Sequence, residues 1–233
     1  MTVLVVTPML AELDALRQAC AQFGLRAEEA VLGRLAVSHC PELGLTLARG
    51  GTGKAQFAAQ MQHLLDAGPA WDVAVCAGAA GALIDDVLVG DVVVATATVE
   101  HDFRNRFRRQ PFPSFEGSPL ALNDLRQLPA PGSCRIHFGV IASGDEDIVD
   151  AERRRALHDA TGALAVAWEG AGGARACAFS GVPFAEIRGV TDSAGSTAAS
   201  DFQANLAGAM ASVASVIASW LTIRRTRSVL QTR

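Results

Sequence analysis

Two stretches decide the fold of this chain, Val166-Ala-Trp-Glu-Gly-Ala-Gly-Gly173 and Val182-Pro-Phe-Ala-Glu-Ile-Arg-Gly-Val-Thr-Asp-Ser-Ala194. In the first, Glu169 separates an apolar run from a small-residue segment that is typical of a tightly packed helix. In the second, Asp192 ends an apolar run that is typical of a buried strand. Ligands bind at the carboxyl ends of strands in open α/β sheets, and a carboxylate there can exchange a proton with them. The pattern therefore predicts a site that contains both carboxylates.

The composition predicts a compact α/β protein. Half of the 233 residues are hydrophobic and 19% are charged, so the chain can bury a substantial core, and we expect residues 1–233 to form a single domain. The net charge of −4 and the pI near 5.7 disfavour nucleic acid as a partner. The chain begins with a strand-like run, and the apolar region 206–221 contains a glycine and several serines. We therefore expect a cytoplasmic protein that does not span a membrane.

The cysteines predict no metal site. The five are scattered along the chain and form neither a CxxC pair nor a cluster with histidine. We expect most of them to be small buried hydrophobes.

Strand-like and helix-like segments alternate along the chain, which is typical of helices packed around a central sheet. We expect strands at residues 3–7, 33–40, 45–49, 71–77, 87–98, 135–142 and 182–190. We expect helices at residues 8–23, 55–67, 150–161, 170–178 and 202–224. The glycine-rich segment 78–81 is expected to be a loop, and the proline-containing segment 100–131 a long loop or flap.

Several charged or glycine-rich features have more than one interpretation. Glu12 is either a solvated helix carboxylate or a site residue. Arg188 stands four residues before Asp192, so a structural ion pair between the two is one interpretation of Asp192. The segment Gly50-Gly-Thr-Gly-Lys54 lacks the spacing of a triphosphate-binding loop, but it is compatible with a turn that passes close to a sugar or phosphate. An arginine cluster is either a solvated loop or a site for an anionic substituent. Its members are Arg104, Arg106, Arg108 and Arg109.

A series of short motifs runs through the whole chain. They are Met9 with Glu12, Gly51-Thr-Gly-Lys54, Ala77-Gly-Ala-Ala-Gly81, Val89-Gly-Asp-Val-Val93, His101-Asp102, Ser143-Gly-Asp145, Trp168-Glu-Gly-Ala171, Val182-Pro-Phe, Ile187-Arg and Thr191-Asp-Ser-Ala194. Each is weak alone, but their order and spacing resemble the purine nucleoside phosphorylase superfamily. Within it, the chain is most similar to the 5'-methylthioadenosine/S-adenosylhomocysteine nucleosidases.

The resemblance implies a three-layer α/β/α sandwich around a mixed, twisted central sheet, and hydrolysis of the N-ribosidic bond of a 5'-modified purine ribonucleoside without a metal or organic cofactor. It implies that Asp192 protonates N7 of the departing base, that Glu169 binds the ribose hydroxyls and that Glu12 activates the attacking water. The substrate-binding residues that it implies are Met9, Thr52, Ala80, Gly81, Ile148, Trp168, Thr191 and Phe202. It also implies a homodimer in which the flap around residues 103–107 completes the neighbour's pocket.

Four positions depart from the pattern of these nucleosidases and leave the substrate open. Ala167 stands where a carboxylate is usual, Trp168 where a methionine is usual, Ala79 where a serine is common and Asp147 where an aromatic residue often stacks on the base. The arginine-rich flap suggests an acidic 5' substituent, so a futalosine hydrolase is one alternative. A phosphorylase is a second, although only Arg49 is an obvious phosphate-binding candidate near the glycine loop. A non-catalytic nucleoside-binding protein is the third.

Overall fold

The computed structural model describes residues 2–22, 24, 26–105, 107–108, 110–129 and 134–231, with side chains described as far as residue 225. Strands and helices alternate through these residues, as the sequence predicts. Their order is β1 (Val3–Thr7), α1 (Leu10–Gln22), β2 (Glu28–Leu32), β3 (Leu35–Cys40), β4 (Leu45–Arg49), α2 (Lys54–Ala67), β5 (Val73–Ala82), β6 (Val92–Glu100), β7 (Ser114–Glu116), α3 (Pro119–Arg126), β8 (Ile136–Ser143), α4 (Ala151–Thr161), β9 (Ala163–Ala167), α5 (Gly170–Ser180), β10 (Phe184–Asp192) and α6 (Ala198–Gln231).

The strands form one mixed sheet. At one end, β2, β3 and β4 make an antiparallel meander, and β4 lies parallel to β1. The sheet continues with β1 parallel to β5, and β5 parallel to β10. Strands β1 and β10 are buried at every position, as expected for parallel strands that are covered on both faces.

The other part of the sheet curls back on itself. Strand β5 pairs with β10, β10 with β6, β6 with β8, β8 with β9, and β9 again with β5. Small side chains pack together among these strands, including Ala80, Ala95, Ala165 and Val190. Because these residues occupy little volume, five strands can close into a narrow barrel-like ring.

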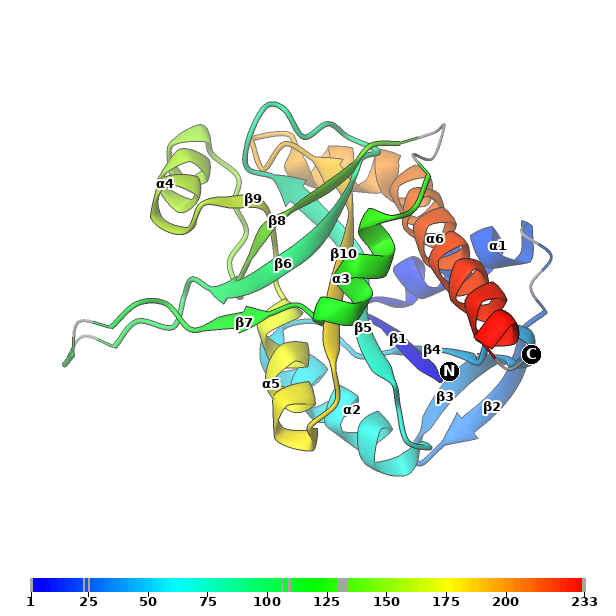
Figure 1. The fold of residues 1–233 in the computed structure, drawn as a ribbon. Helices are drawn as coiled ribbons and strands as arrows, with labels where there is room; N and C mark the ends of the chain where they lie inside the picture. Colours follow the sequence, from blue (N-terminus) through cyan, green and yellow to red (C-terminus); the bar gives the residue numbers. More distant parts are fainter. Residues whose placement is uncertain are drawn as a thin grey trace.

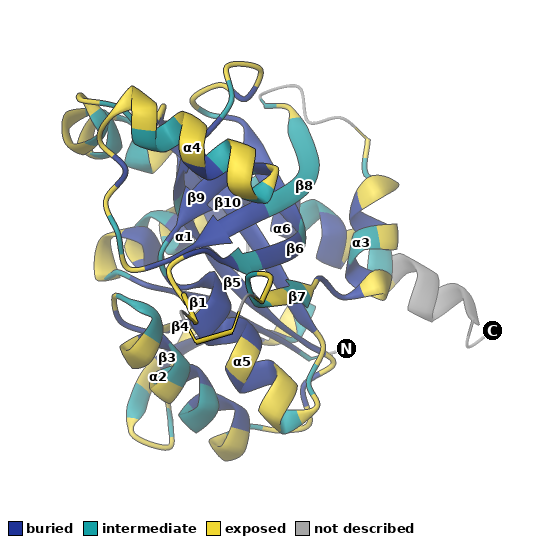
Figure 2. Ribbon diagram, turned by 90° about the vertical axis from the view of Figure 1, so that its left-hand side faces the viewer, coloured by how far each residue is buried: buried dark blue, intermediate teal, exposed yellow. Residues whose placement is uncertain are grey.

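Helices cover both faces of the sheet and complete the three layers (Figure 1). On one face, α1, α3 and α6 pack on β1, β5 and β10 in a core that contains Leu16, Leu125 and Trp220. On the other face, α2 and α5 pack against each other and bury Phe57 and Met61. Figure 2 shows that the strands between these layers are buried, whereas the outer surfaces of α2, α4 and α5 are exposed. The predicted α/β fold with a mixed central sheet is confirmed.

The prediction of a loop at residues 78–81 is wrong, because β5 continues as a strand to Ala82. A Cβ atom at Gly78 would lie 2.7 Å from Glu12 Oε1, and one at Gly81 would lie 2.8 Å from Asp192 Oδ1. The glycines therefore make room for two carboxylates beside a strand, and they do not mark a turn.

The prediction of a long loop at residues 100–131 is wrong in part. Its middle forms β7, which pairs with β6, followed by helix α3. Ser118 begins this helix with its Oγ accepting a hydrogen bond from Ala121 N, and Pro119 occupies the first turn, where a missing N–H is tolerated. Strand β2 was also not expected.

Helix α6 contains the apolar region 206–221, whose glycine and serines were expected to disfavour a membrane span. By length and composition alone, its segment Ala198–Arg225 is long and apolar enough to cross a membrane, with a mean hydropathy of 1.8 in its most apolar window. However, 56% of that window is buried inside the protein, where Met210, Val213 and Trp220 belong to the core shared with α1 and the sheet. Packing in this core accounts for the apolar composition of the helix.

Candidate active site

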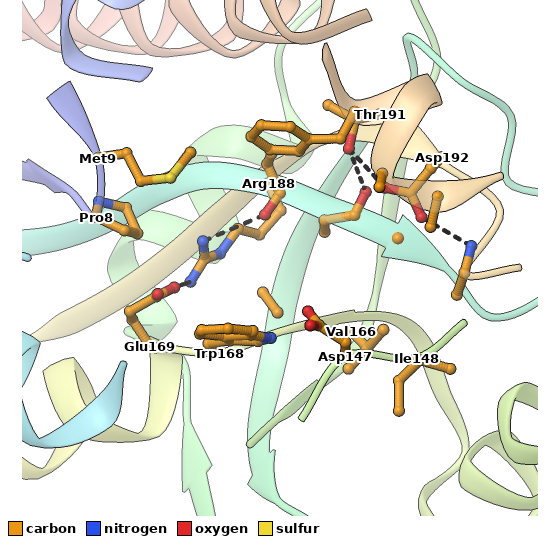
Figure 3. Close-up of a pocket in the computed structure, with 18 of the residues that line it drawn as sticks. Pro8, Met9, Asp147, Ile148, Val166, Trp168, Glu169, Arg188, Thr191 and Asp192 are labelled. Atoms are coloured by element: carbon orange, nitrogen blue, oxygen red, sulfur yellow. Dashed lines mark hydrogen bonds and ion pairs between the residues drawn. The ribbon is translucent and has the colours of Figure 1, made fainter. Parts of the chain in front are cut away.

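A cavity of about 420 Å³ lies where β1, β5, β9 and β10 end, beside the first turns of α1 and α6. Every catalytic and substrate-binding residue that the resemblance implies lines this cavity. They are Met9, Glu12, Thr52, Ala80, Gly81, Ile148, Trp168, Glu169, Thr191, Asp192 and Phe202. Figure 3 shows Met9, Arg188 and Glu169 at one end of it, and Asp192, Asp147 and Ile148 at the other.

Glu12 lies in the first turn of α1 and is 3% exposed, which excludes the interpretation as a solvated helix carboxylate. Its two oxygens accept hydrogen bonds from the backbone N–H groups of Met9 and Ala79, each at 2.8 Å. Burial raises the pKa of Glu12 to about 7, although these N–H groups and the guanidinium of Arg188 oppose the shift. Glu12 can therefore gain or lose a proton near neutral pH.

Glu169 joins the glycine-rich loop to the cavity. Its Oε1 accepts a hydrogen bond from Gly53 N at 3.1 Å, and its Oε2 lies 3.4 Å from Arg188 Nη2. Burial raises the pKa of Glu169, while Arg188 and the Gly53 N–H act in the opposite direction. The small-residue helix α5 begins at the next residue and packs against α2, so the loop and the carboxylate are held together by the same contact between helices.

Asp192 is held by neutral donors at the end of β10. Its Oδ2 accepts a hydrogen bond from Thr191 Oγ1 and its Oδ1 one from Ala194 N, both at 2.8 Å. Ala194 has a φ of 50°, a left-handed conformation that is unusual for a residue with a side chain. This conformation accompanies the turn in which the Ala194 N–H meets the carboxylate.

The ion pair suggested by the spacing of Arg188 and Asp192 is not formed between these two described residues. Both lie on a strand, where four residues span about 13 Å. Arg188 is instead buried beside Glu186, Glu169 and Cys76, with Nε 2.8 Å from Glu186 Oε1 and Nη2 3.2 Å from Cys76 Sγ. Arg188 also lines the cavity, a place in the site that its spacing from Asp192 did not indicate.

Other cavity residues that no sequence motif predicted include Glu146, Gln203, Ala198 and Ala199. The latter three lie on the first turns of α6, where no local motif marked them. A signal did exist for Arg188 and Glu186, since two opposite charges interrupt an otherwise apolar strand, and buried charges of this kind are paired.

Trp168 forms one wall of the cavity. Its indole Nε1 donates a hydrogen bond to the backbone oxygen of Glu146 at 3.2 Å, and Figure 3 shows the ring lying across the cavity from Thr191. Asp147, one of the departures from the usual pattern, lies farther along the same side. An aromatic surface therefore remains in the cavity although position 147 is not aromatic.

The two described members of the arginine cluster do not line the cavity of this chain. Arg104 and Arg108 are exposed, and neither is among the residues around the cavity. Arg106 and Arg109 lie outside the described residues. Arg49, the expected phosphate-binding candidate, is exposed and also stands apart from the cavity lining.

Within the part of the chain that the structure describes, no three His, Cys, Asp or Glu side chains are grouped so that they could hold a metal ion. The cysteines are free thiols, and all except the half-buried Cys134 are buried. The expectation that most of them are buried hydrophobes is confirmed.

The chain matches a known protein family over most of its length. The model of the Phosphorylase superfamily matches residues 2–222, so this protein is a member of that superfamily, as the motifs indicated.

Among its relatives are nucleosidases. The chain is 33% identical over 132 residues to the aminodeoxyfutalosine nucleosidase of Helicobacter pylori, covering 54% of this chain and 57% of that protein. It is 29% identical over 178 residues to the 5'-methylthioadenosine/S-adenosylhomocysteine nucleosidase of Mycobacterium bovis, covering 64% and 70%. The first match thus spans little more than half of that relative's length. The crystal structure of the H. pylori 5'-methylthioadenosine/S-adenosylhomocysteine nucleosidase superimposes with a TM-score of 0.85 at 24% identity, covering 95% of this chain and 98% of that chain, and this agreement confirms the fold.

Proposed function

We propose that this protein is a purine nucleosidase that hydrolyses the N-ribosidic bond of a 5'-modified ribonucleoside. The observation that carries the proposal is the convergence of three buried carboxylates, Glu12, Glu169 and Asp192, in one cavity. Two ends of the same cavity thus offer groups for the two proton transfers of hydrolysis, one to the base and one from water. The nucleosidase names of the relatives support the same reaction.

In the proposed mechanism Asp192 acts on the base. When the bond between C1' and N9 breaks, its electron pair goes to the purine, which departs poorly as an anion. A proton delivered to N7 by Asp192 makes the base a neutral leaving group. The hydrogen bonds from Thr191 and Ala194 N fix the carboxyl group, and a positioned acid of this kind contributes about 10²–10⁴-fold to the rate.

Glu12 and Glu169 act on the ribose and the water. Positive charge develops on the ribose as the bond breaks, and the neighbouring carboxylates stabilise it. Glu169 also accepts hydrogen bonds from the ribose hydroxyls. Water adds to C1' and gives its proton to Glu12, whose pKa of about 7 suits a base that works near neutral pH.

The surroundings of Arg188 favour water over phosphate as the nucleophile. A phosphorylase needs cationic or N–H donors that are free to bind a dianion. The Arg188 guanidinium is already in contact with Glu186, Glu169, Cys76 and the Ala79 carbonyl. Glu12 beside it would repel phosphate when ionised, and this supports hydrolysis. A non-catalytic binding protein would gain nothing from keeping a buried carboxylate with a pKa near neutrality.

We propose that the base is stacked on Trp168, and that the backbone of Ile148 reads its edge. The base is adenine or hypoxanthine, and the 5' group is a thioether, as in methylthioadenosine and adenosylhomocysteine. A futalosine-type substrate is the second candidate, because the H. pylori aminodeoxyfutalosine nucleosidase is among the relatives.

We also propose that residues 1–233 form a single domain and that the protein is a cytoplasmic homodimer. Phe103 and Phe107 are 53% and 101% exposed on the segment after β6. Large apolar side chains exposed in this way are typical of protein interfaces, and the partner's flap would then complete the open side of the cavity.

Base release from a nucleoside panel tests the proposed function. The panel holds methylthioadenosine, adenosylhomocysteine, futalosine, adenosine and inosine, each with and without inorganic phosphate, and products are separated by chromatography. We expect free base and free sugar without phosphate. Release that requires phosphate and yields ribose 1-phosphate would establish the phosphorylase, and tight binding without release would establish the binding protein.

A further inference from the structure

We propose that Glu186, which does not line the cavity, is a positioning residue that fixes Arg188 and sets the charge balance beneath the ribose. This inference rests on the proposed function, since it deepens the account of the same site. Glu186 lies buried behind the cavity wall, where it contacts Arg188, which lines the cavity.

Glu186 is fully buried on β10 and makes two strong contacts. Its Oε1 accepts a hydrogen bond from Arg188 Nε at 2.8 Å, and its Oε2 accepts one from Thr98 Oγ1 at 2.5 Å. Its carboxylate also occupies the space in front of Gly170, where a Cβ atom would lie 2.2 Å from Oε2. Gly170 is the first residue of α5, and the positive end of a helix dipole favours a negative charge at this place. Strand β10, the Thr98 hydroxyl and the space left by Gly170 therefore fix the position of this carboxylate.

The contact with Nε controls the direction of the rest of the guanidinium. Because the guanidinium is planar, anchoring Nε leaves Nη1 3.3 Å from the Ala79 carbonyl and Nη2 3.4 Å from Glu169 Oε2. Arg188 Nη1 and Glu12 Oε1 both approach the position that a Cβ of Gly78 would take, at 2.8 and 2.7 Å. Arg188 is thus held between Glu12 and Glu169, the two carboxylates at the end of the cavity that the proposed mechanism assigns to the ribose, which we call the ribose end.

The charges of this cluster do not balance when all of its carboxylates are ionised. Glu12 on α1, Glu169 before α5 and Glu186 on β10 face the single guanidinium of Arg188. Cys76 on β5 adds no charge, because burial raises the pKa of its thiol well above the usual value. Since Glu186 shares the positive charge of Arg188, less of it remains to stabilise ionised Glu12. Glu186 thereby helps Glu12 to keep its proton up to neutral pH.

The variant Glu186→Gln removes this charge with little change of shape. The amide oxygen can still accept from Arg188 Nε, and the amide nitrogen can donate to Thr98 Oγ1. We expect the acid limb of the kcat/KM profile to move to lower pH by about one unit. The matched control is Asp124→Asn, which removes a buried carboxylate that is paired with Arg224 at 3.1 Å on α6, and it should leave the limb in place.

A second measurement does not depend on turnover. The folded-state pKa of Glu12 is raised above its ordinary value, so between about pH 4.5 and 7 the folded protein binds more protons than the unfolded chain. The stability of the wild type relative to Glu12→Gln must then fall as the pH rises through this window. We expect this fall, measured by urea unfolding at pH 5 and pH 8, to be smaller when both proteins also carry Glu186→Gln.

An unshifted acid limb together with an equal fall of stability in both backgrounds would overturn the role of Glu186. If wild type releases no base from any nucleoside, the proposed function fails, but the unfolding comparison still decides this inference. If Glu186→Gln does not fold, Thr98→Val replaces it, since valine suits the strand and removes the hydroxyl donor. That variant should shift the limb and reduce the fall in the same directions, by less, and no change in either would again contradict the proposal.

Discussion

The two ends of the cavity hold their carboxylates in opposite ways. At the end that the proposed mechanism assigns to the ribose, Glu12 and Glu169 share the guanidinium of Arg188, and burial raises the pKa of each. At the opposite end, which the proposed mechanism assigns to the base and which we call the base end, Asp192 is held by one hydroxyl and one backbone N–H. Asp147, at the same end, is exposed. The ribose end is therefore a network whose proton affinities depend on every member, whereas the base end depends on the orientation of one carboxyl group. Substitutions at the two ends should therefore change the kinetics and the pH profile in different ways.

The largest effect is expected for Asp192→Asn at the base end. Asparagine keeps an oxygen that can accept the Ala194 N–H, but it cannot deliver a proton to N7. We expect kcat to fall by about 10²–10⁴-fold, with substrate affinity largely retained because the cavity keeps its shape. Single-turnover rates and equilibrium binding measure the two quantities separately. Asp159→Asn on the exposed face of α4 serves as the control. A variant that turns over at the wild-type rate would remove Asp192 from the mechanism.

The next largest effect is expected for two glycine substitutions that distinguish the two ends by steric contact alone. Gly78→Ala would push its Cβ against Glu12 and Arg188, and Gly81→Ala would push its Cβ against Asp192. We expect each to lower kcat/KM by roughly 10²-fold, the cost of misplacing a reacting group by about 1 Å. Only Gly78→Ala should also move the acid limb of the pH profile, because only it disturbs the network.

The control for both glycine variants is Gly208→Ala on α6, where a Cβ meets nothing within 4 Å. It should leave activity unchanged and stabilise the helix by about 0.5–1 kcal/mol. Equal pH profiles for Gly78→Ala and Gly81→Ala would contradict the distinction between the two ends.

The pH dependence of the wild type is expected to report the ribose end. Glu12 must be ionised to accept a proton from water, and burial raises its pKa to about 7. We therefore expect kcat/KM to fall about tenfold per pH unit as the pH drops below 7. Rates measured from pH 5 to 9, with activity recovered on return to pH 8 to exclude unfolding, give this profile. A rate that stays constant from pH 8 down to pH 5.5 would show that Glu12 is not the base.

The same difference explains what could be predicted from the sequence. Asp192 and Glu169 were found because each ends an apolar segment that the structure places at the carboxyl edge of the sheet. The partners of Arg188 were predicted wrongly. Its ion-pair partner Glu186 is only two residues away along the same strand, whereas Glu12, Cys76 and Glu169 come from other elements. Residues 78–81 were misplaced because glycine commonly marks a turn, yet here it marks close approach of side chains to a strand. Contacts between distant segments follow from the closed strand ring, which local patterns do not reveal.

The smallest effect is expected for Trp168→Phe, which sharpens the account of the base end. Phenylalanine keeps an aromatic surface for the base but loses the hydrogen bond from the indole to the Glu146 carbonyl. A neutral hydrogen bond contributes about 0.5–1.5 kcal/mol, so we expect KM to rise by roughly two- to tenfold with kcat nearly unchanged. Trp168→Leu, which removes the aromatic surface as well, should raise KM further, because base stacking on an aromatic side chain contributes about 1–3 kcal/mol. Steady-state kinetics on the preferred nucleoside measure both variants. If kcat falls and KM stays constant, Trp168 acts on the transition state at the ribose end, and the division of the cavity into two independent ends would have to be abandoned.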